Sequence, residues 1–138
     1  MADTRSLVQE LYAAYERGDG ARVSALLHDD IDWNIYAPAN LFPFAGPRRG
    51  RTAVLETLKG IGEMFALVSY RPQNIVVDGN RAAVMSDATF THRATGRAVN
   101  LRIANFLRWQ DGRVIEFREF ANTFDAAEQV LGRTLATA

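Results

Sequence analysis

The sequence predicts an α+β fold in which helices come first and a long antiparallel sheet follows. Three observations indicate this class: apolar residues recur at helical spacing in the first third, they alternate along the second half, and short Gly-containing turns separate the alternating stretches. Helices followed by a run of hairpin-connected strands are typical of α+β proteins. No internal repeat or low-complexity tract interrupts this order, so we expect one domain over residues 1–138.

The first predicted element is a helix in which Leu7, Leu11 and Tyr15 recur at four-residue spacing and therefore share one face. Gly18 is suited to end this helix, because glycine tolerates the left-handed backbone that commonly follows a helix. We expect Asp19 to cap a second, short helix by accepting a hydrogen bond from a free backbone N–H.

A strand and a loop follow the second helix. Residues 28–30 are polar and break the helical pattern. Ile31, Trp33 and Ile35 then alternate with polar residues, which predicts a strand with one apolar face. Residues 37–50 hold three of the four prolines of the chain, so we expect them to form a loop.

The remaining elements are a third helix and an antiparallel meander. The helix carries Val54, Leu58, Ile61 and Phe65 on one face. Four predicted strands separated by tight turns follow at 67–78, 81–92, 97–109 and 113–121. A last helix is predicted at 125–132, with Asp125 as its cap and Gly132 at its end. We expect Pro72 to mark a sheet edge or a bulge, since proline cannot donate to the hydrogen-bond ladder.

The composition excludes several classes of protein. Sixteen basic and 16 acidic residues cancel, which argues against a nucleic-acid or membrane-surface binder. The absence of cysteine excludes disulfides, thiolate zinc sites and cysteine nucleophiles. No apolar run reaches the roughly 18–20 residues that span a membrane, and the N-terminus lacks the apolar stretch of a signal peptide. We therefore expect a soluble cytoplasmic protein that uses neither a metal ion nor another cofactor.

Three stretches, taken in this order, carry a family resemblance: Arg17-Gly18-Asp19, residues 27–33 and residues 46–54. Over about residues 5–131 the chain resembles the nuclear transport factor 2-like superfamily, in particular the SnoaL-like polyketide cyclases and ketosteroid-isomerase-related proteins. The resemblance implies a strongly curved sheet wrapped around the N-terminal helices, forming a cone with an apolar pocket. It does not imply one reaction, because this scaffold hosts isomerases, cyclases, epoxide hydrolases and non-catalytic binders.

The steroid isomerase mechanism is not expected. Ketosteroid isomerases use a tyrosine and a protonated aspartic acid as oxyanion donors and a second aspartate as base. When the turns of the chain serve as anchors, these three positions fall on Leu11, Asn105 and Ile35. Only Asn105 can donate a hydrogen bond, and none of the three can accept the substrate's proton.

Two polar residues lie on strand faces that are otherwise apolar. Asn105 lies on the face of Ile103, and Glu119 follows Ile115 and Phe117. Their strands are neighbours across a tight turn, so we expect the two side chains within a residue or two of the same register. In SnoaL-like cyclases a carboxylate on the last strand faces the pocket and acts as acid and base. The resemblance therefore implies that Glu119 is the general base and Asn105 a polar anchor for a developing enolate oxygen.

Alternatives to this assignment are open at the level of sequence. Glu119 could pair with Arg102 or Arg118 after a register slip, and Asn105 could be purely structural. An epoxide-hydrolase site would need Asp87 in the pocket, whereas alternation assigns the neighbouring Ser86 to that side.

The predicted function is isomerase- or cyclase-type catalysis on a small hydrophobic carbonyl compound. The alternatives are a non-catalytic binder of a hydrophobic metabolite and an interaction domain. Besides Glu119 and Asn105, the residues expected to contact the ligand are Tyr15, Trp33, Ile35, Phe42, Phe44, Ile103 and Phe117. We also expect a homodimer through the outer sheet face, where Phe106 and Phe120 lie among charged residues.

Overall fold

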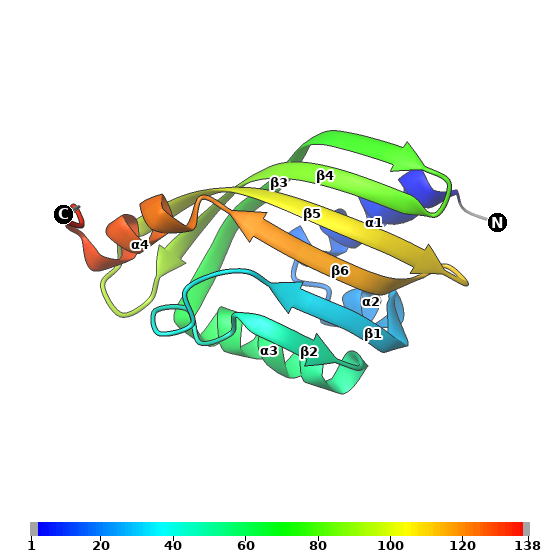
Figure 1. Ribbon diagram of the computed structural model, residues 1–138, viewed down its shortest axis with the longest axis horizontal. Helices are drawn as coiled ribbons and strands as arrows, with labels where there is room; N and C mark the ends of the chain where they lie inside the picture. The colour runs from blue at the N-terminus through cyan, green and yellow to red at the C-terminus, as the bar shows by residue number, and fades with distance from the viewer. Residues whose placement is uncertain (1–2, 137–138) are drawn as a thin grey trace.

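The structure is a computed structural model that describes residues 3–136 (Figure 1). Helices precede most of the sheet, which confirms the predicted α+β class. The elements are α1 (Thr4–Glu16), α2 (Gly20–Ala25), β1 (Leu27–Ile35), β2 (Gly46–Arg49), α3 (Arg51–Met64), β3 (Phe65–Asp78), β4 (Arg81–His92), β5 (Ala98–Gln110), β6 (Arg113–Ala121) and α4 (Thr123–Leu131).

The strands of this region form one six-stranded sheet in the order β2-β1-β6-β5-β4-β3. Neighbouring strands are antiparallel except for β1 and β6, which run parallel. Figure 1 shows the sheet as an open, curved layer, with α1 behind it and α3 beside β1 and β2. The pairing of β1 with β6 places the first strand beside the last one, and the last strand therefore lies inside the sheet.

The first strand and the predicted loop differ from expectation. Residues 28–30 lie outside α2, as expected, but β1 begins at Leu27, so they belong to the strand that the sequence predicted only from Ile31. Asp29 and Asp30 are exposed strand residues, and Asp29 is 2.6 Å from Arg51. Within the predicted loop, residues 46–49 form β2, which pairs with β1. β2 is an edge strand. An edge strand can hold Pro47, because no neighbouring strand needs the N–H that proline lacks.

Smaller differences concern the ends of elements and the bulges. Phe65 starts β3 instead of ending α3. Asn122 precedes α4, so Asp125 lies in the first helical turn and does not cap it. A register shift follows Pro72 on the edge strand β3, which confirms the predicted edge or bulge. A second shift lies between Val114 and Glu116 in the pairing of β6 with β5, and it buries Val114 where the sequence predicted Ile115.

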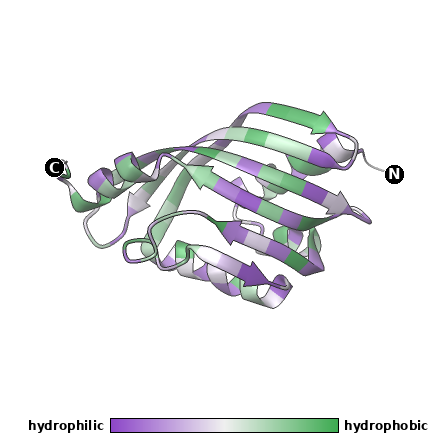
Figure 2. Ribbon diagram, in the orientation of Figure 1, coloured by the Kyte–Doolittle hydropathy of each residue, from purple (hydrophilic) through white to green (hydrophobic). Residues whose placement is uncertain are grey.

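The core lies between the helices and the inner face of the sheet, defined here as the face that carries Trp33, Asn105 and Phe117. Hydrophilic and hydrophobic residues alternate along the strands in Figure 2, as a sheet with one buried face requires. On α1 the buried positions include Val8 and Tyr12, one turn apart, which press against the sheet. None of the helices within residues 3–136 combines the length and the apolarity needed to cross a membrane.

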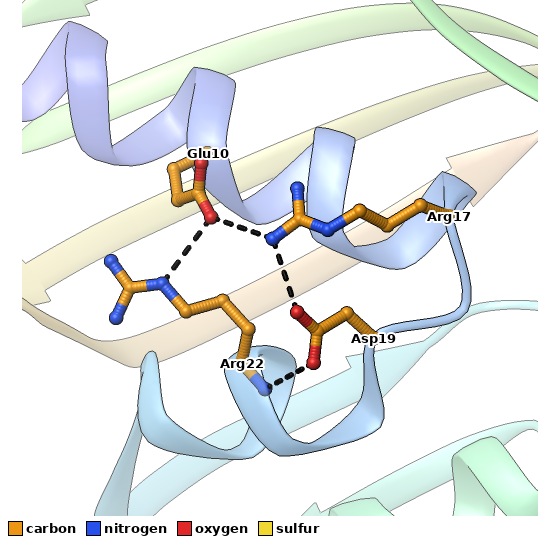
Figure 3. Close-up of polar contacts among 4 residues, drawn as sticks. All are labelled: Glu10, Arg17, Asp19 and Arg22. Atoms are coloured by element: carbon orange, nitrogen blue, oxygen red, sulfur yellow. Dashed lines mark hydrogen bonds and ion pairs between the residues drawn. The ribbon is translucent and has the colours of Figure 1, made fainter.

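A surface network joins α1 to α2 (Figure 3). Glu10 Oε1 accepts hydrogen bonds from Arg17 Nη2 at 2.9 Å and Arg22 Nε at 3.3 Å. Arg17 also contacts Asp19, which caps α2 through the backbone N–H of Arg22 at 3.0 Å. Each exposed ion pair contributes at most about 1 kcal/mol to stability. Together they fix the turn after α1 and so help to set the position of the C-terminal half of that helix.

Candidate functional site

A cavity of about 120 Å³ lies between the helices and the inner face of the sheet. A single buried water needs only about 10–15 Å³, so the space is several times that of one water. Its lining is mostly aromatic and aliphatic, with contributions from α1, α3 and five strands. Every residue that the sequence analysis proposed for the site borders it: Tyr15, Trp33, Ile35, Phe42, Phe44, Ile103, Asn105, Phe117 and Glu119.

Aromatic rings form two walls of the cavity. Trp33 and Phe117 are partners in the parallel pairing of β1 with β6, and their rings stack with centroids 4.0 Å apart and planes at 13°. On the other side, Phe42 and Phe44 from the segment before β2 lie with centroids 5.9 Å apart, and Phe44 meets Phe65 edge-on at 6.3 Å. The segment before β2 is therefore part of the cavity wall.

Glu119 is the one carboxylate that borders the cavity among the described residues. Sheet pairing sets it opposite Asn105 on β5 and opposite Ile35 on β1. The side chain keeps some accessible surface toward the cavity, while the surrounding protein removes most of the water from its carboxyl group. This desolvation raises the pKa of Glu119 to about 7, although the hydrogen bond from Asn105 lowers that pKa in part.

Asn105 connects Glu119 to two tyrosines. Its Nδ2 donates to Glu119 Oε1 at 3.1 Å, and its Oδ1 accepts from the Tyr12 hydroxyl at 2.6 Å and the Tyr70 hydroxyl at 3.3 Å. Asn105 borders the cavity, but its exposed fraction is 0%. As the structure stands, the amide contacts Glu119 and the tyrosines, and none of its surface is available to a ligand.

Tyr12 and Tyr70 are site residues that were not predicted from the sequence. Tyr12 directly follows Leu11, the position aligned with the isomerase tyrosine, so a shift of one residue in that alignment would have found it. Tyr70 pairs with Ala88, whose strand face was correctly predicted to point inward. Register shifts on both sides of Tyr70 interrupt the alternation of β3. The inward direction of Tyr70 could therefore not be predicted without the pairing of β3 with β4.

The structure also locates the groups named in the alternative assignments. Arg118 lies 3.2 Å from Asp32, and Arg102 lies 3.8 Å from Asp87, so neither arginine pairs with Glu119. Asp87 is on the exposed outer face, away from the cavity. Within residues 3–136 no group of three His, Asp or Glu side chains could hold a metal ion, and none of the cavity-lining side chains is Lys, Arg or His.

We predict that Phe44→Ala weakens the binding of an apolar ligand more than it lowers the melting temperature. Phe44 is half-buried and borders the cavity, so truncation removes ligand contact at modest cost to packing. Phe42, by contrast, is only 5% exposed and belongs to the core, where truncation of phenylalanine costs about 3–5 kcal/mol. Thermal melts and fluorescence titration with a hydrophobic dye separate the two effects. Equal dye affinity in Phe44→Ala and wild type would contradict the prediction.

Comparisons with known proteins agree with this architecture. Residues 8–117 match the family model of the SnoaL-like domain. A candidate isomerase from Rhodopseudomonas palustris is 33% identical, with a TM-score of 0.82 and coverage of 91% of this chain and 93% of that one. An NTF2-like protein from Burkholderia xenovorans is 28% identical, with a TM-score of 0.78 and coverage of 94% and 98%. An LEH-like epoxide hydrolase from M. tuberculosis, at 16% identity, TM-score 0.76 and coverage of 94% and 90%, shares the fold alone. No curated protein matches the chain.

Proposed function

The chain belongs to the SnoaL-like domain family, and from this premise we propose that it is an isomerase- or cyclase-type enzyme acting on a small hydrophobic carbonyl compound. The observation that carries the proposal is Glu119, a desolvated carboxyl group at an apolar cavity with a pKa of about 7. A base whose pKa lies near neutrality can both remove and return a proton at physiological pH.

In the proposed reaction the apolar walls hold the body of the substrate and place the carbon next to its carbonyl group beside Glu119. The carboxylate of Glu119 takes a proton from that carbon, and the electrons of the broken C–H bond move to the carbonyl oxygen as an enolate. The protonated Glu119 then returns the proton to the same or another carbon. In the cyclisation branch the enolate carbon instead attacks a second carbonyl carbon of the substrate, the electron pair of that C=O π bond moves to its oxygen, and this oxygen takes the proton from Glu119. Both outcomes need only one titrating group.

The enolate oxygen requires a hydrogen-bond donor, and we propose Tyr15 for this role. Tyr15 borders the cavity, and its hydroxyl makes no hydrogen bond to another described residue, whereas those of Tyr12 and Tyr70 are committed to Asn105. Burial and the negative charge of Glu119 raise the pKa of Tyr15 to about 12, so the phenol stays protonated. A neutral donor beside the developing charge stabilises it in a water-poor site.

A non-catalytic binder of a hydrophobic metabolite is the second candidate function. It is favoured by the commitment of the Asn105 amide to its neighbours, and by the lack of a second carboxylate, a His or a Lys beside Glu119 among the described residues of the lining. The same walls would hold a ligand without any proton transfer.

Proton exchange separates the two candidates. Small cyclic ketones are incubated with the protein in D₂O, and loss of the signal of the proton next to the carbonyl is followed by ¹H NMR. The enzyme proposal predicts faster exchange that rises with pH through about 7 as Glu119 ionises. Ketones that raise the melting temperature without any accelerated exchange would support the binder and contradict the enzyme.

We propose that the protein is a homodimer through the outer sheet face. Phe106 and Phe120 are 52% and 47% exposed there, and their rings meet edge-on at 6.1 Å. Charges of both signs flank them, as in the pair of Arg108 with Glu116 at 3.8 Å, so the face can complement a second copy of itself.

Light scattering at micromolar concentration is expected to give the mass of a dimer, and the double variant Phe106→Asp/Phe120→Asp the mass of a monomer. Phe124→Asp is the matched control, because Phe124 is 56% exposed but lies on α4, off the sheet face. A monomeric wild type, or a control that dissociates as readily as the double variant, would contradict this interface.

A further inference from the structure

We propose that Tyr12 and Tyr70 are positioning residues that act through Asn105, because their two hydroxyl groups fix which end of the Asn105 side-chain amide faces Glu119. The inference rests on the proposed function only for its consequence in catalysis, and the arrangement itself can be tested without a substrate. Neither tyrosine is proposed to touch the reacting atoms.

The hydrogen bonds around Asn105 define one orientation of the amide. An asparagine side chain accepts only at its oxygen and donates only at its nitrogen. Both tyrosine hydroxyls converge on Oδ1, Tyr12 at 2.6 Å and Tyr70 at 3.3 Å, and Nδ2 is directed at Glu119 Oε1 at 3.1 Å. Rotation of the amide by half a turn would place Oδ1 against the carboxylate, where two acceptors repel each other.

Burial restricts the side chains of this hydrogen-bond network to the one arrangement. Asn105, Tyr12 and Tyr70 are buried and come from three different elements, β5, α1 and β3. The rings of Tyr12 and Tyr70 lie 5.6 Å apart, so each limits the movement of the other. A buried polar atom left without a hydrogen-bond partner is unfavourable. The amide therefore responds to the removal of a hydroxyl by changing its own orientation.

The orientation decides which form of Glu119 is favoured. An N–H donor stabilises the ionised carboxylate, whereas a carbonyl oxygen accepts a hydrogen bond from the protonated acid and stabilises that form. In the wild type, desolvation raises the pKa of Glu119 and is the larger influence, whereas the hydrogen bond from the Asn105 N–H lowers that pKa in part. Without the two hydroxyls, Oδ1 is free to turn toward Glu119, and the acid holds its proton to higher pH.

The other titratable groups around Glu119 do not explain such a change. Those that border the cavity with it are Tyr12 and Tyr15 from α1, Tyr36 after β1, and Tyr70 from β3. Burial and the charge of Glu119 raise the pKa values of Tyr12, Tyr15 and Tyr70, so these phenols remain neutral while Glu119 titrates. The lining residues from β4, α3 and α4 carry no charge.

The test is a titration of Glu119 in the full-length protein. The side-chain carboxyl carbon of ¹³C-labelled glutamate is followed by NMR from pH 5 to 10, and Glu119→Gln assigns its signal. The variants are Tyr12→Phe, Tyr70→Phe and the pair, which keep the rings, and Tyr36→Phe is the control because the Tyr36 hydroxyl does not bond to Asn105. The double variant is expected to raise the midpoint by about one pH unit or more, a tenfold change in the ionisation equilibrium.

A double-mutant cycle shows whether the effect passes through the amide. In an Asn105→Leu background the same tyrosine substitutions are expected to leave the midpoint of Glu119 unchanged. Once a substrate is known, the midpoint of the pH profile of kcat/KM should shift to higher pH by the same amount as the NMR midpoint of Glu119. If the double variant does not fold, Tyr70→Phe alone can be used. It loses the longer hydrogen bond and is expected to raise the midpoint of Glu119 by a smaller amount.

An unchanged or lowered midpoint in the tyrosine variants would overturn the inference, and so would an equal shift in the Asn105→Leu background. These results are independent of the proposed reaction. If Glu119→Gln retained full exchange activity, the proposed function would fail while the titration of the tyrosine variants kept its meaning.

Discussion

Glu119→Gln is expected to slow proton exchange on a carbonyl substrate by roughly 10²–10⁴-fold, the usual contribution of a general acid–base group. Glutamine has nearly the same shape, and its carbonyl oxygen can still accept the hydrogen bond that Asn105 Nδ2 donates to Glu119 Oε1 at 3.1 Å. It cannot accept the substrate's proton. Ligand affinity should change far less than rate, because the aromatic walls of the cavity are intact.

The measurement is the exchange rate of the proton next to the carbonyl for any ketone that the wild type turns over, with binding followed in parallel. Glu63→Gln is the matched control, since Glu63 is an exposed residue of α3 and its loss should leave the rate unchanged. Exchange in Glu119→Gln within about threefold of the wild-type rate would exclude Glu119 as the base.

The second large effect concerns stability and pH. The pKa of Glu119 is raised from 4.5 to about 7 by burial, so between these values the folded protein holds a proton that the unfolded chain has released. Unfolding therefore releases a proton in this window, and the free energy of unfolding falls as pH rises from 4.5 to 7. At 1.36 kcal/mol per pKa unit, the loss attributable to Glu119 is about 3 kcal/mol, and it stays constant above pH 7.

Glu119→Gln isolates this contribution, because glutamine does not titrate and all other groups are shared. Urea unfolding at pH 5, 6, 7 and 8 should show the variant gaining on the wild type by about 2.5 kcal/mol across the series, because pH 5 already lies above 4.5, with no further gain at higher pH. A difference between the two proteins that is independent of pH would contradict the raised pKa. A variant that loses about 3–5 kcal/mol at every pH would instead indicate a broken buried ion pair.

The sequence was sufficient to predict the meander, and the pairing at the site to within a residue or two. Strand alternation has a period of two, and β5 keeps it without a bulge from Val99 to Leu107 against β4, so the inward direction of Asn105 was readable from the chain alone. Direct pairing about the turn between β5 and β6 would set Arg118 opposite Asn105, and the register shift between Val114 and Glu116 instead brings Glu119 there. Local signals were decisive because both strands are adjacent in the chain.

Features that depend on distant partners were not predictable. β2 is a strand only because β1 lies beside it. Its own sequence favours a loop, since Pro47 lies between Gly46 and Gly50. Tyr12 and Tyr70 become site residues through hydrogen bonds to Asn105, 93 and 35 positions away. Helical periodicity indicates which positions of a helix are buried, but it does not reveal which buried hydroxyl has which partner.

The parallel pairing of β1 with β6 has a consequence for how the protein acquires its site during synthesis. Ile35 and Glu119 are direct neighbours in the sheet although 84 residues separate them in the chain. The hairpins of β3 to β6 close over short loops, whereas β1 must wait for the most distant partner, a contact with a high entropic barrier. On a ribosome, the N-terminal helices and β1 emerge with their apolar faces uncovered until the last fifth of the chain follows. The cavity is thus among the last parts of the fold to form, and Trp33 and Ile35 lack their neighbours Phe117 and Glu119 until β6 has been made.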